Sequence, residues 1–245
     1  MKNRLLLLLS ATLLFGACTK HPVLPDLSTR AVDTVLHGKA NFCNVEYRFA
    51  SILNAAKSPA LRTIEQANIG YFFQLEEFSG TFDEALQTAL TEIQTNFLAE
   101  GGNPTIEGYE ISVEAEGTVV DSLLCYTITR AGYTGGAHGM YSTECHNYSL
   151  RDGFELSLAD LFSDKGLQKL DVLIREKIAA QYHATTDDEL TEAGFFPEYL
   201  APTENFLLSP EGMTFYYNPY DIGCYALGEV IVTVSPDELK KLRSE

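Results

Sequence analysis

The stretch Tyr133-Thr134-Gly135-Gly136-Ala137-His138-Gly139 stands between two segments that have the composition of β-strands. Before it, residues 122–130 alternate apolar and polar side chains, which is the period of a strand with one buried face. After it, residues 141–150 are rich in aromatic and β-favouring side chains. Its glycines allow positive φ angles or the close approach of another backbone. The stretch therefore predicts the tip of an antiparallel hairpin.

The cysteines give this hairpin a possible covalent link. Those that follow Cys18 are Cys43, Cys125, Cys145 and Cys224. Cys125 and Cys145 are equally far from Gly135, so a hairpin centred there would place them opposite each other. A disulfide between them depends on the register of the strands, and free, mostly buried thiols are the alternative. No two cysteines have the spacing of a zinc motif.

The N-terminal half combines strand and helix patterns. Alternation over residues 41–49 predicts a strand, residues 52–68 predict a loop or weak helix, and residues 69–75 predict a second strand. Thr81 and Glu84 have the spacing of a capping box, so a helix is expected to start there and to end at Gly101-Gly102. Residues 109–116 predict a half-exposed strand. We interpret its outer row, Glu110, Glu114 and Glu116, as a solvated face.

The C-terminal half repeats this mixture. Asp152-Gly153 predicts a tight turn after which the sheet continues over residues 154–156. Helices are expected over residues 164–182 and 236–242, a loop over residues 185–192, and strands over residues 206–208, 213–217 and 229–234. The predicted class is α+β, with antiparallel sheets packed against a few amphipathic helices in two associated subdomains.

The first residues have the features of an export signal. A basic start, an apolar run over residues 5–15 and small residues before Cys18 are typical of a bacterial lipoprotein, and an ordinary cleaved signal is the alternative. We expect a signal peptide over residues 1–17, a fatty-acylated (palmitate-bearing) Cys18 and a tether over residues 18–30. The protein would then be anchored to the bacterial cell envelope and face the periplasm or the cell exterior.

The charge of the chain narrows the classes of partner. The formal net charge is −17, so nucleic acid and anionic lipid surfaces are not expected as partners. A cationic partner would be attracted to such a surface. Acidity that only keeps an exported protein soluble is the alternative explanation.

Three groups of residues carry a family resemblance: Gly135-Gly136-Ala137-His138-Gly139; Asn147-Tyr148-Ser149-Leu150 with Gly153, Leu156 and Leu161-Phe162; and residues 215–222 with Tyr225-Ala226 and Gly228. They resemble a bacterial family of exported α+β domains, first catalogued as a domain of unknown function. That family forms the extracellular part of lysozyme-sensing anti-sigma factors (RsiV-like) and accompanies some peptidoglycan deacetylases (PdaC-like). The resemblance implies an RsiV-like domain over residues 118–245 and a PdaC-like accessory domain over residues 31–117. These residues include no sigma-binding or deacetylase segment, so we do not expect either role.

Two turns supply the candidate ligand-binding residues: Tyr133, Gly135, Gly136 and His138 in the hairpin tip, and Tyr220 and Tyr225 in a tyrosine-rich segment. An accessible histidine could contact a ligand or sense pH, and a hydrogen bond to the backbone of its own loop is the alternative. Tyrosines can recognise a partner or stack on sugar rings, or belong to the core. His138 and His146 on one hairpin form no recognised metal motif, so no metal, cofactor or catalytic residue is predicted.

Two functions of different classes follow. The first, which we favour, is a non-catalytic binding lipoprotein whose ligand is a cationic protein such as lysozyme or a peptidoglycan fragment. The second is a cell-wall glycan hydrolase, or an accessory to one, that uses carboxylates or His138.

Overall fold

The computed structural model describes residues 21–99 and 108–243. The expected signal peptide and Cys18 lie outside these residues. The helix expected to end at Gly101-Gly102 ends earlier, at Asn96, with Phe97 as its C-cap. None of the helices in the described ranges is both long enough and apolar enough to cross a membrane.

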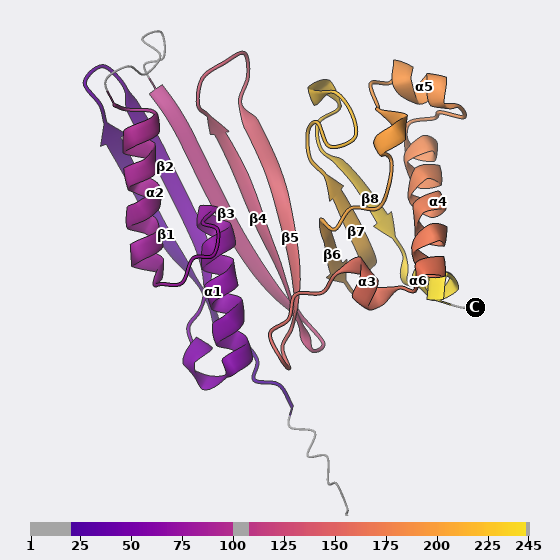
Figure 1. Cartoon of the computed structure of the whole chain (residues 1–245), viewed down its shortest axis with the longest axis horizontal. Helices are drawn as coiled ribbons and strands as arrows, with labels where there is room; N and C mark the ends of the chain where they lie inside the picture. Colours follow the sequence, from indigo (N-terminus) through magenta and orange to yellow (C-terminus); the bar gives the residue numbers. More distant parts are fainter. Residues whose placement is uncertain (1–20, 100–107, 244–245) are drawn as a thin grey trace, which may run out of the picture.

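The larger sheet contains β1 (Leu27–His37), β2 (Phe42–Ile52), β3 (Gly108–Val120), β4 (Leu123–Tyr133) and β5 (Met140–Ser149), in that spatial order. The helices α1 (Pro59–Phe73) and α2 (Phe82–Asn96) connect β2 to β3 and cover one face of this sheet (Figure 1). Because a helical crossover returns the chain to the same end of the sheet, β2 and β3 pair in parallel. The other neighbouring strands pair antiparallel.

The N-terminal part corrects two predictions. The helical alternative for residues 52–68 is correct from Pro59 onward, but residues 69–75 do not form a strand, because most of them continue the same helix, α1. A short apolar run such as residues 69–75 fits either structure, and here Leu61, Ile64 and Phe72 bury one helical stripe against the sheet. The expected tether is also shorter, because β1 begins at Leu27. The capping box of Thr81 and Glu84 is confirmed at the start of α2.

The smaller sheet contains β6 (Phe206–Ser209), β7 (Gly212–Tyr217) and β8 (Val230–Val234). It lies between β5 and the helix α4 (Asp164–Gln181), with α6 (Pro236–Arg243) at one end (Figure 1). Shorter elements connect these parts: η1 (Ala55–Lys57), α3 (Leu158–Leu161), α5 (Asp187–Glu192), η2 (Pro197–Tyr199) and η3 (Tyr225–Leu227). The loop expected over residues 185–192 is mostly α5, whose N-cap is the Thr186 hydroxyl.

Each sheet has its own hydrophobic core, which confirms the α+β class and the two associated subdomains. The first core ends at Leu150 and the second begins at Leu158. The boundary expected at residues 117 and 118 falls inside β3, so it does not coincide with the division between the cores. We call the two parts the N-terminal and C-terminal subdomains. Residues 154–156 add no further strand, and only the bridge between Tyr148 and Glu155 extends the sheet there.

The hairpin of β4 and β5 has a different register from the one expected. Cys125 lies opposite Asn147, and Cys145 lies opposite Thr127. The loop is centred on Gly136 rather than Gly135, so the two cysteines are diagonal neighbours instead of a facing pair. Both thiols are buried and free, so the candidate disulfide does not form and the alternative of free, buried thiols holds for this pair. A diagonal pair is too widely spaced for an unstrained disulfide.

Candidate functional site

The hairpin tip is exposed and carries the backbone angles that its glycines allow. Gly135 and Gly136 have φ angles of 98° and 110°. Gly139 is needed for a different reason, because an added Cβ would lie 2.9 Å from the Gly132 carbonyl oxygen. Thr134, Ala137 and His138 are exposed to solvent. The sequence prediction of a glycine-dependent, accessible tip is therefore confirmed.

The C-terminal subdomain places its tyrosine-rich turn against this tip. The His138 ring stacks on Tyr225, with ring centres 3.7 Å apart and planes at 19°. The Tyr225 hydroxyl donates to the Gly139 carbonyl at 2.7 Å. Tyr220 brings its hydroxyl within 3.5 Å of His138 Nε2, although the two residues are 82 positions apart in the sequence. The two predicted segments thus form one cluster, which we call the tip cluster: Tyr133, His138, Tyr220 and Tyr225.

Hydrogen bonds inside the tip hold its side chains in place. His138 Nδ1 lies 2.8 Å from the Gly139 carbonyl oxygen, so this nitrogen carries the proton. The Tyr133 hydroxyl donates to the Gly136 carbonyl at 3.0 Å. The backbone contact considered for His138 therefore exists, and its ring face and Nε2 are turned to the tyrosines. This arrangement orders the tip cluster without burying it.

Beside the tip cluster lies a groove of about 500 Å³ on the face of the larger sheet that no helix covers. Its lining includes Glu46, Glu110, Tyr133, Tyr141 and Tyr225. The strand register places Glu46 and Glu110 on neighbouring strands of the same face. Neither takes part in an ion pair between described residues. The groove therefore combines tyrosine rings with carboxylates that are free to bind a ligand.

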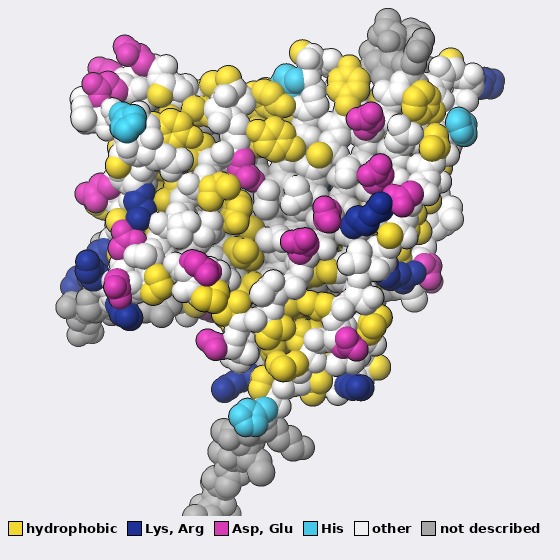
Figure 2. Space-filling view, turned by 180° about the vertical axis from the view of Figure 1, so that it is seen from behind, with side chains coloured by type: hydrophobic (Ala, Val, Ile, Leu, Met, Phe, Trp, Pro, Cys, Tyr) yellow, Lys and Arg dark blue, Asp and Glu magenta, His cyan; other side chains and the backbone are white. Residues whose placement is uncertain are grey.

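Acidic side chains continue across the same open face, as the sequence predicted for β3. Glu110, Glu114 and Glu116 are exposed, and the Arg48 guanidinium binds Asp33 at 2.6 Å. Figure 2 shows acidic side chains gathered over the middle of the face opposite to α1 and α2. A cationic ligand would be attracted to this face before it reached the groove.

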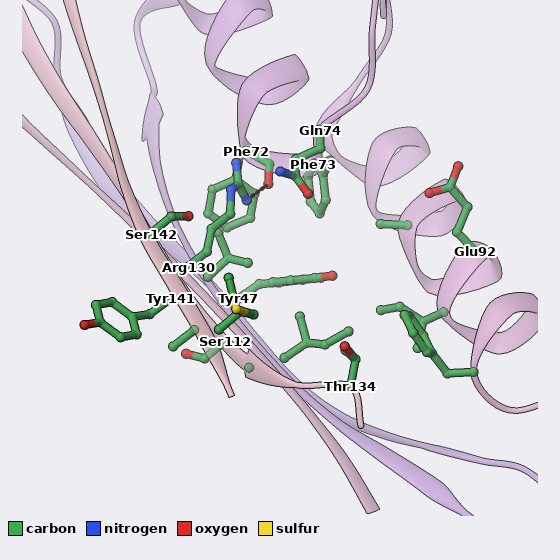
Figure 3. Close-up of a pocket in the computed structure, with 18 of the residues that line it drawn as sticks. Tyr47, Phe72, Phe73, Gln74, Glu92, Ser112, Arg130, Thr134, Tyr141 and Ser142 are labelled. Atoms are coloured by element: carbon green, nitrogen blue, oxygen red, sulfur yellow. Dashed lines mark hydrogen bonds between the residues drawn. The ribbon is translucent and has the colours of Figure 1, made fainter. Parts of the chain in front are cut away.

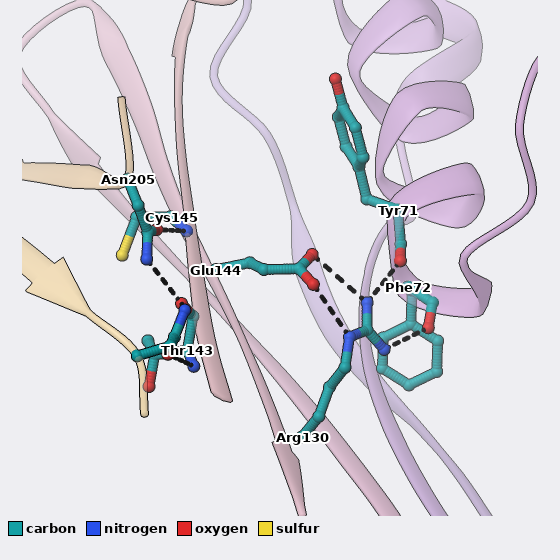
Figure 4. Close-up of polar contacts among 8 residues, drawn as sticks. Tyr71, Phe72, Arg130, Thr143, Glu144, Cys145 and Asn205 are labelled. Atoms are coloured by element: carbon teal, nitrogen blue, oxygen red, sulfur yellow. Dashed lines mark hydrogen bonds and ion pairs between the residues drawn. The ribbon is translucent and has the colours of Figure 1, made fainter. Parts of the chain in front are cut away.

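Asparagine side chains join the C-terminal subdomain to the outer edge of β5 (Figure 4). Asn205 accepts from the Cys145 amide at 2.8 Å and donates to the Thr143 carbonyl at 2.7 Å. Asn218 accepts from the Thr143 amide at 2.7 Å. These amides take the place of a neighbouring strand, and they hold the turn that carries Tyr220 and Tyr225. Sequence reasoning missed both asparagines, although Asn218 lay within the family motif.

A second hollow, of about 400 Å³, lies between the larger sheet and its helices. Figure 3 shows Tyr47, Phe72 and Phe73 around it, with Arg130 at one side. Burial raises the pKa of Tyr47 to about 12, so its hydroxyl keeps its proton at neutral pH. Arg130 is already engaged: it donates to the Phe72 carbonyl at 2.9 Å and to Glu144 at 3.1 Å (Figure 4). The other charged side chain in the lining, Glu92 on α2, is a single exposed carboxylate, whereas the groove beside the tip cluster contains two.

His146 lies apart from the tip cluster. It faces the helices, where its ring stacks on Tyr71 at 4.1 Å and its Nδ1 lies 2.6 Å from Glu155. His138 and His146 therefore have different partners. Within residues 21–99 and 108–243 no three histidine, cysteine or acidic side chains are grouped so that they could hold a metal ion.

Comparisons with known proteins support the fold and name a family. Residues 159–237 match the family described as "Protein of unknown function (DUF3298)". A solved structure of a DUF3298 family member from Bacteroides fragilis is 25% identical, with a TM-score of 0.76 over 92% of this chain and 96% of that one. A DUF3298 family protein from Pseudomonas aeruginosa is 16% identical, with a TM-score of 0.65 over 90% and 95% of the two chains. No curated protein matches this chain. The predicted resemblance to a domain of unknown function is confirmed at this level.

Proposed function

We propose that this protein is a bacterial cell-envelope lipoprotein that binds its ligand without catalysis, through the tip cluster and the groove beside it. The observation that carries the proposal is the meeting of two distant segments in one exposed aromatic cluster. The stacked pair of His138 and Tyr225 borders a groove that also contains Glu46 and Glu110. Ordered aromatic rings at a surface are typical of recognition sites.

The chemistry of the groove selects between classes of ligand. Carboxylates beside tyrosine rings suit lysine and arginine side chains, through ion pairs and contacts with the ring faces. Tyrosine faces also stack on sugar rings, and carboxylates accept hydrogen bonds from sugar hydroxyls. We therefore propose a cationic protein such as lysozyme as the first candidate and a peptidoglycan fragment as the second. The resemblance to extracellular domains of lysozyme-sensing anti-sigma factors supports the same order.

A titration of the purified protein with lysozyme tests the first candidate. The double variant Glu46→Gln/Glu110→Gln removes the groove carboxylates and should raise the Kd about tenfold, or ~1.4 kcal/mol. The matched control Glu114→Gln/Glu116→Gln removes the same number of charges from the same face of the sheet, but outside the groove lining. It should change the Kd much less. Equal weakening by both variants would mean that only the general negative charge attracts lysozyme.

Salt and a second ligand complete this test. Absence of binding, or binding that vanishes near physiological ionic strength, would exclude lysozyme as a specific partner, because purely long-range attraction is screened there. Peptidoglycan fragments would then be titrated against the same variants. Release of soluble products from peptidoglycan would instead favour a hydrolase, and turnover that survives His138→Ala would exclude that histidine from its chemistry.

Mass spectrometry of the protein from its membrane fraction tests the anchor. The mature N-terminus should be Cys18 with a mass increase from fatty acyl groups, and Cys18→Ser should move the protein to the soluble fraction. An unmodified N-terminus generated at another residue would remove the lipid anchor from the proposal.

A further inference from the structure

The end of the larger sheet from which the chain leads back to its N-terminus carries a group of exposed apolar side chains. Leu24, Leu53 and Phe154 are 56%, 64% and 71% exposed, and Val119 is 37% exposed. Phe154 and Leu53 have the largest exposed fractions among the large apolar residues described. We call these four residues the apolar end face. Single exposed apolar residues need no explanation, but a group at one end of a sheet indicates a contact.

Leu24, Leu53 and Phe154 stand on loops and Val119 lies at the end of β3, and hydrogen bonds hold these loops to the neighbouring backbone. The side-chain amide of Asn54 donates to the Leu24 carbonyl at 2.9 Å, and the backbone amide of Leu53 donates to the Asp26 carbonyl at 2.8 Å. The Ser149 amide donates to the Phe154 carbonyl, and the Leu150 amide donates to the Ser122 carbonyl in the turn after β3. The apolar end face is therefore a firm surface in which large side chains remain exposed despite ordered backbones.

The position of this face in the chain indicates what covers it. Figure 1 shows residues 21–26 leading away from β1 at the end where these loops lie. Cys18 precedes Leu24, the first residue of the apolar end face, by six positions, a reach of at most about 22 Å for extended chain. If Cys18 is fatty-acylated, as proposed above, the apolar end face is held within a short distance of the lipid headgroups.

The charge of this end also fits a bilayer. It carries Lys57, Arg62 and Arg151 together with Asp26, Asp121, Asp152, Glu65 and Glu155, so basic groups offset a larger share of the acidic ones here than on the open face of the sheet. Figure 2 shows apolar side chains between basic ones at the end where the N-terminal segment leaves. An apolar surface of mixed charge meets less repulsion at an anionic membrane than the acidic open face of the sheet would.

We infer that the apolar end face contacts the lipid bilayer, with Phe154, Leu53 and Leu24 placed in its interfacial region. The contact orients the protein, because the tip cluster lies at the opposite end of β4 and β5 and therefore points away from the membrane. This inference rests on the proposed lipid anchor for its geometry, but the contact is made by the folded body itself.

The chain contains no tryptophan, so a single introduced tryptophan reports on one place. Full-length protein carrying Phe154→Trp is reconstituted in phosphatidylcholine vesicles, with and without brominated acyl chains. Its emission should shift to shorter wavelength and lose most of its intensity with the brominated lipid, at low and at high salt. The matched control Tyr199→Trp, at a side chain 61% exposed in the C-terminal subdomain, should show neither change. Leu53→Trp repeats the test on a second loop.

The outcomes distinguish the bilayer contact from the lipid anchor. Protein that sediments with the vesicles while Phe154→Trp and Leu53→Trp behave like Tyr199→Trp would overturn the contact and leave the anchor in place. Quenching of Phe154→Trp in protein that mass spectrometry shows to be unacylated would support the contact and overturn the anchor. Protein that neither sediments nor shows quenching would overturn both, whereas quenching lost at high salt would overturn an apolar contact.

Discussion

The larger sheet is joined to its helices and to the C-terminal subdomain by different chemistry. Against α1 and α2 the junction is a set of buried rings, in which Phe72 packs edge-on against Tyr47, Phe49 and Phe73. At the outer edge of β5 the junction includes the amide hydrogen bonds of Asn205 and Asn218, together with those of Asn147 to the backbone of β6. We call them the aromatic junction and the amide junction.

The difference explains why the candidate site lies beside the amide junction. Apolar packing contributes most of the stability of a domain, but it is not directional. Hydrogen bonds are directional, so the amide junction sets how the C-terminal subdomain is oriented over the hairpin tip. The stacking of His138 on Tyr225 depends on that orientation. Substitutions in the two junctions should therefore have effects that differ in size and in kind.

The largest effect is expected in the aromatic junction. Phe72→Ala removes a ring that is 1% exposed, and it should lower the free energy of unfolding by about 3–5 kcal/mol, because a cavity replaces the lost contacts. The same substitution at exposed Phe154 should change it by less than about 0.5 kcal/mol. Urea denaturation monitored by circular dichroism measures both. Similar losses for the two variants would show that the aromatic junction does not carry the stability assigned to it.

An intermediate effect is expected in the amide junction. Asn205→Ala leaves the Cys145 amide without its acceptor, and it should cost about 1–3 kcal/mol, the penalty for an unpaired buried group. The rate of hydrogen exchange should increase at the Cys145 backbone amide, and it should increase less at the amides of α1. The control Asn44→Ala, on the open face, should leave both measurements close to those of the unchanged protein. Unchanged exchange at Cys145 in Asn205→Ala would contradict the role of this junction.

A smaller effect should appear as a pH dependence on the helix side. Burial alone would raise the pKa of Glu155, but hydrogen bonds from His146 and Tyr71 and the charge of His146 together hold it below the ordinary 4.5. A lowered folded-state pKa contributes stability above pH 4.5, and this contribution is lost as the pH falls through the folded-state value. Glu155→Gln should therefore lose less stability on acidification than the unchanged protein. Urea denaturation midpoints of both proteins, measured at a series of pH values from neutral to below 4.5, check this prediction. Midpoints that fall equally with pH in the two proteins would contradict it.

The smallest effect on stability is expected in the tip cluster, beside the amide junction. His138→Ala removes an exposed ring, so the free energy of unfolding should change by about 0.5 kcal/mol or less. Ligand binding should weaken nevertheless, because Tyr225 loses the ring that stacks on it and fixes its orientation. His138→Phe keeps an aromatic ring there and should retain more of the affinity. If both variants bind as the unchanged protein does, the tip cluster is not the contact surface.

The sequence predicted the elements whose signals are local. The capping box at Thr81, the glycine-dependent tip and the alternation of β3 and β4 each depend on neighbouring residues, and all are present. The sequence prediction failed where a short apolar run allowed either a helix or a strand, as at the end of α1. It also failed where the centre of the hairpin loop moved by one residue and changed the strand register, as at Cys125. Both failures concern choices that local propensity leaves nearly equal in energy.

By itself, the sequence determined the α+β class, the exposed tip with His138 and the acidic outer row of β3, because side-chain period and glycine content act within a few residues. Only the tertiary structure decided that Tyr220 and Tyr225 lie on that tip, that Glu46 joins Glu110 in one groove, and that exposed apolar residues share one end of the sheet. These groupings come from strand register and from the amide junction. Both join residues far apart in the chain, and no local pattern of residues specifies such contacts.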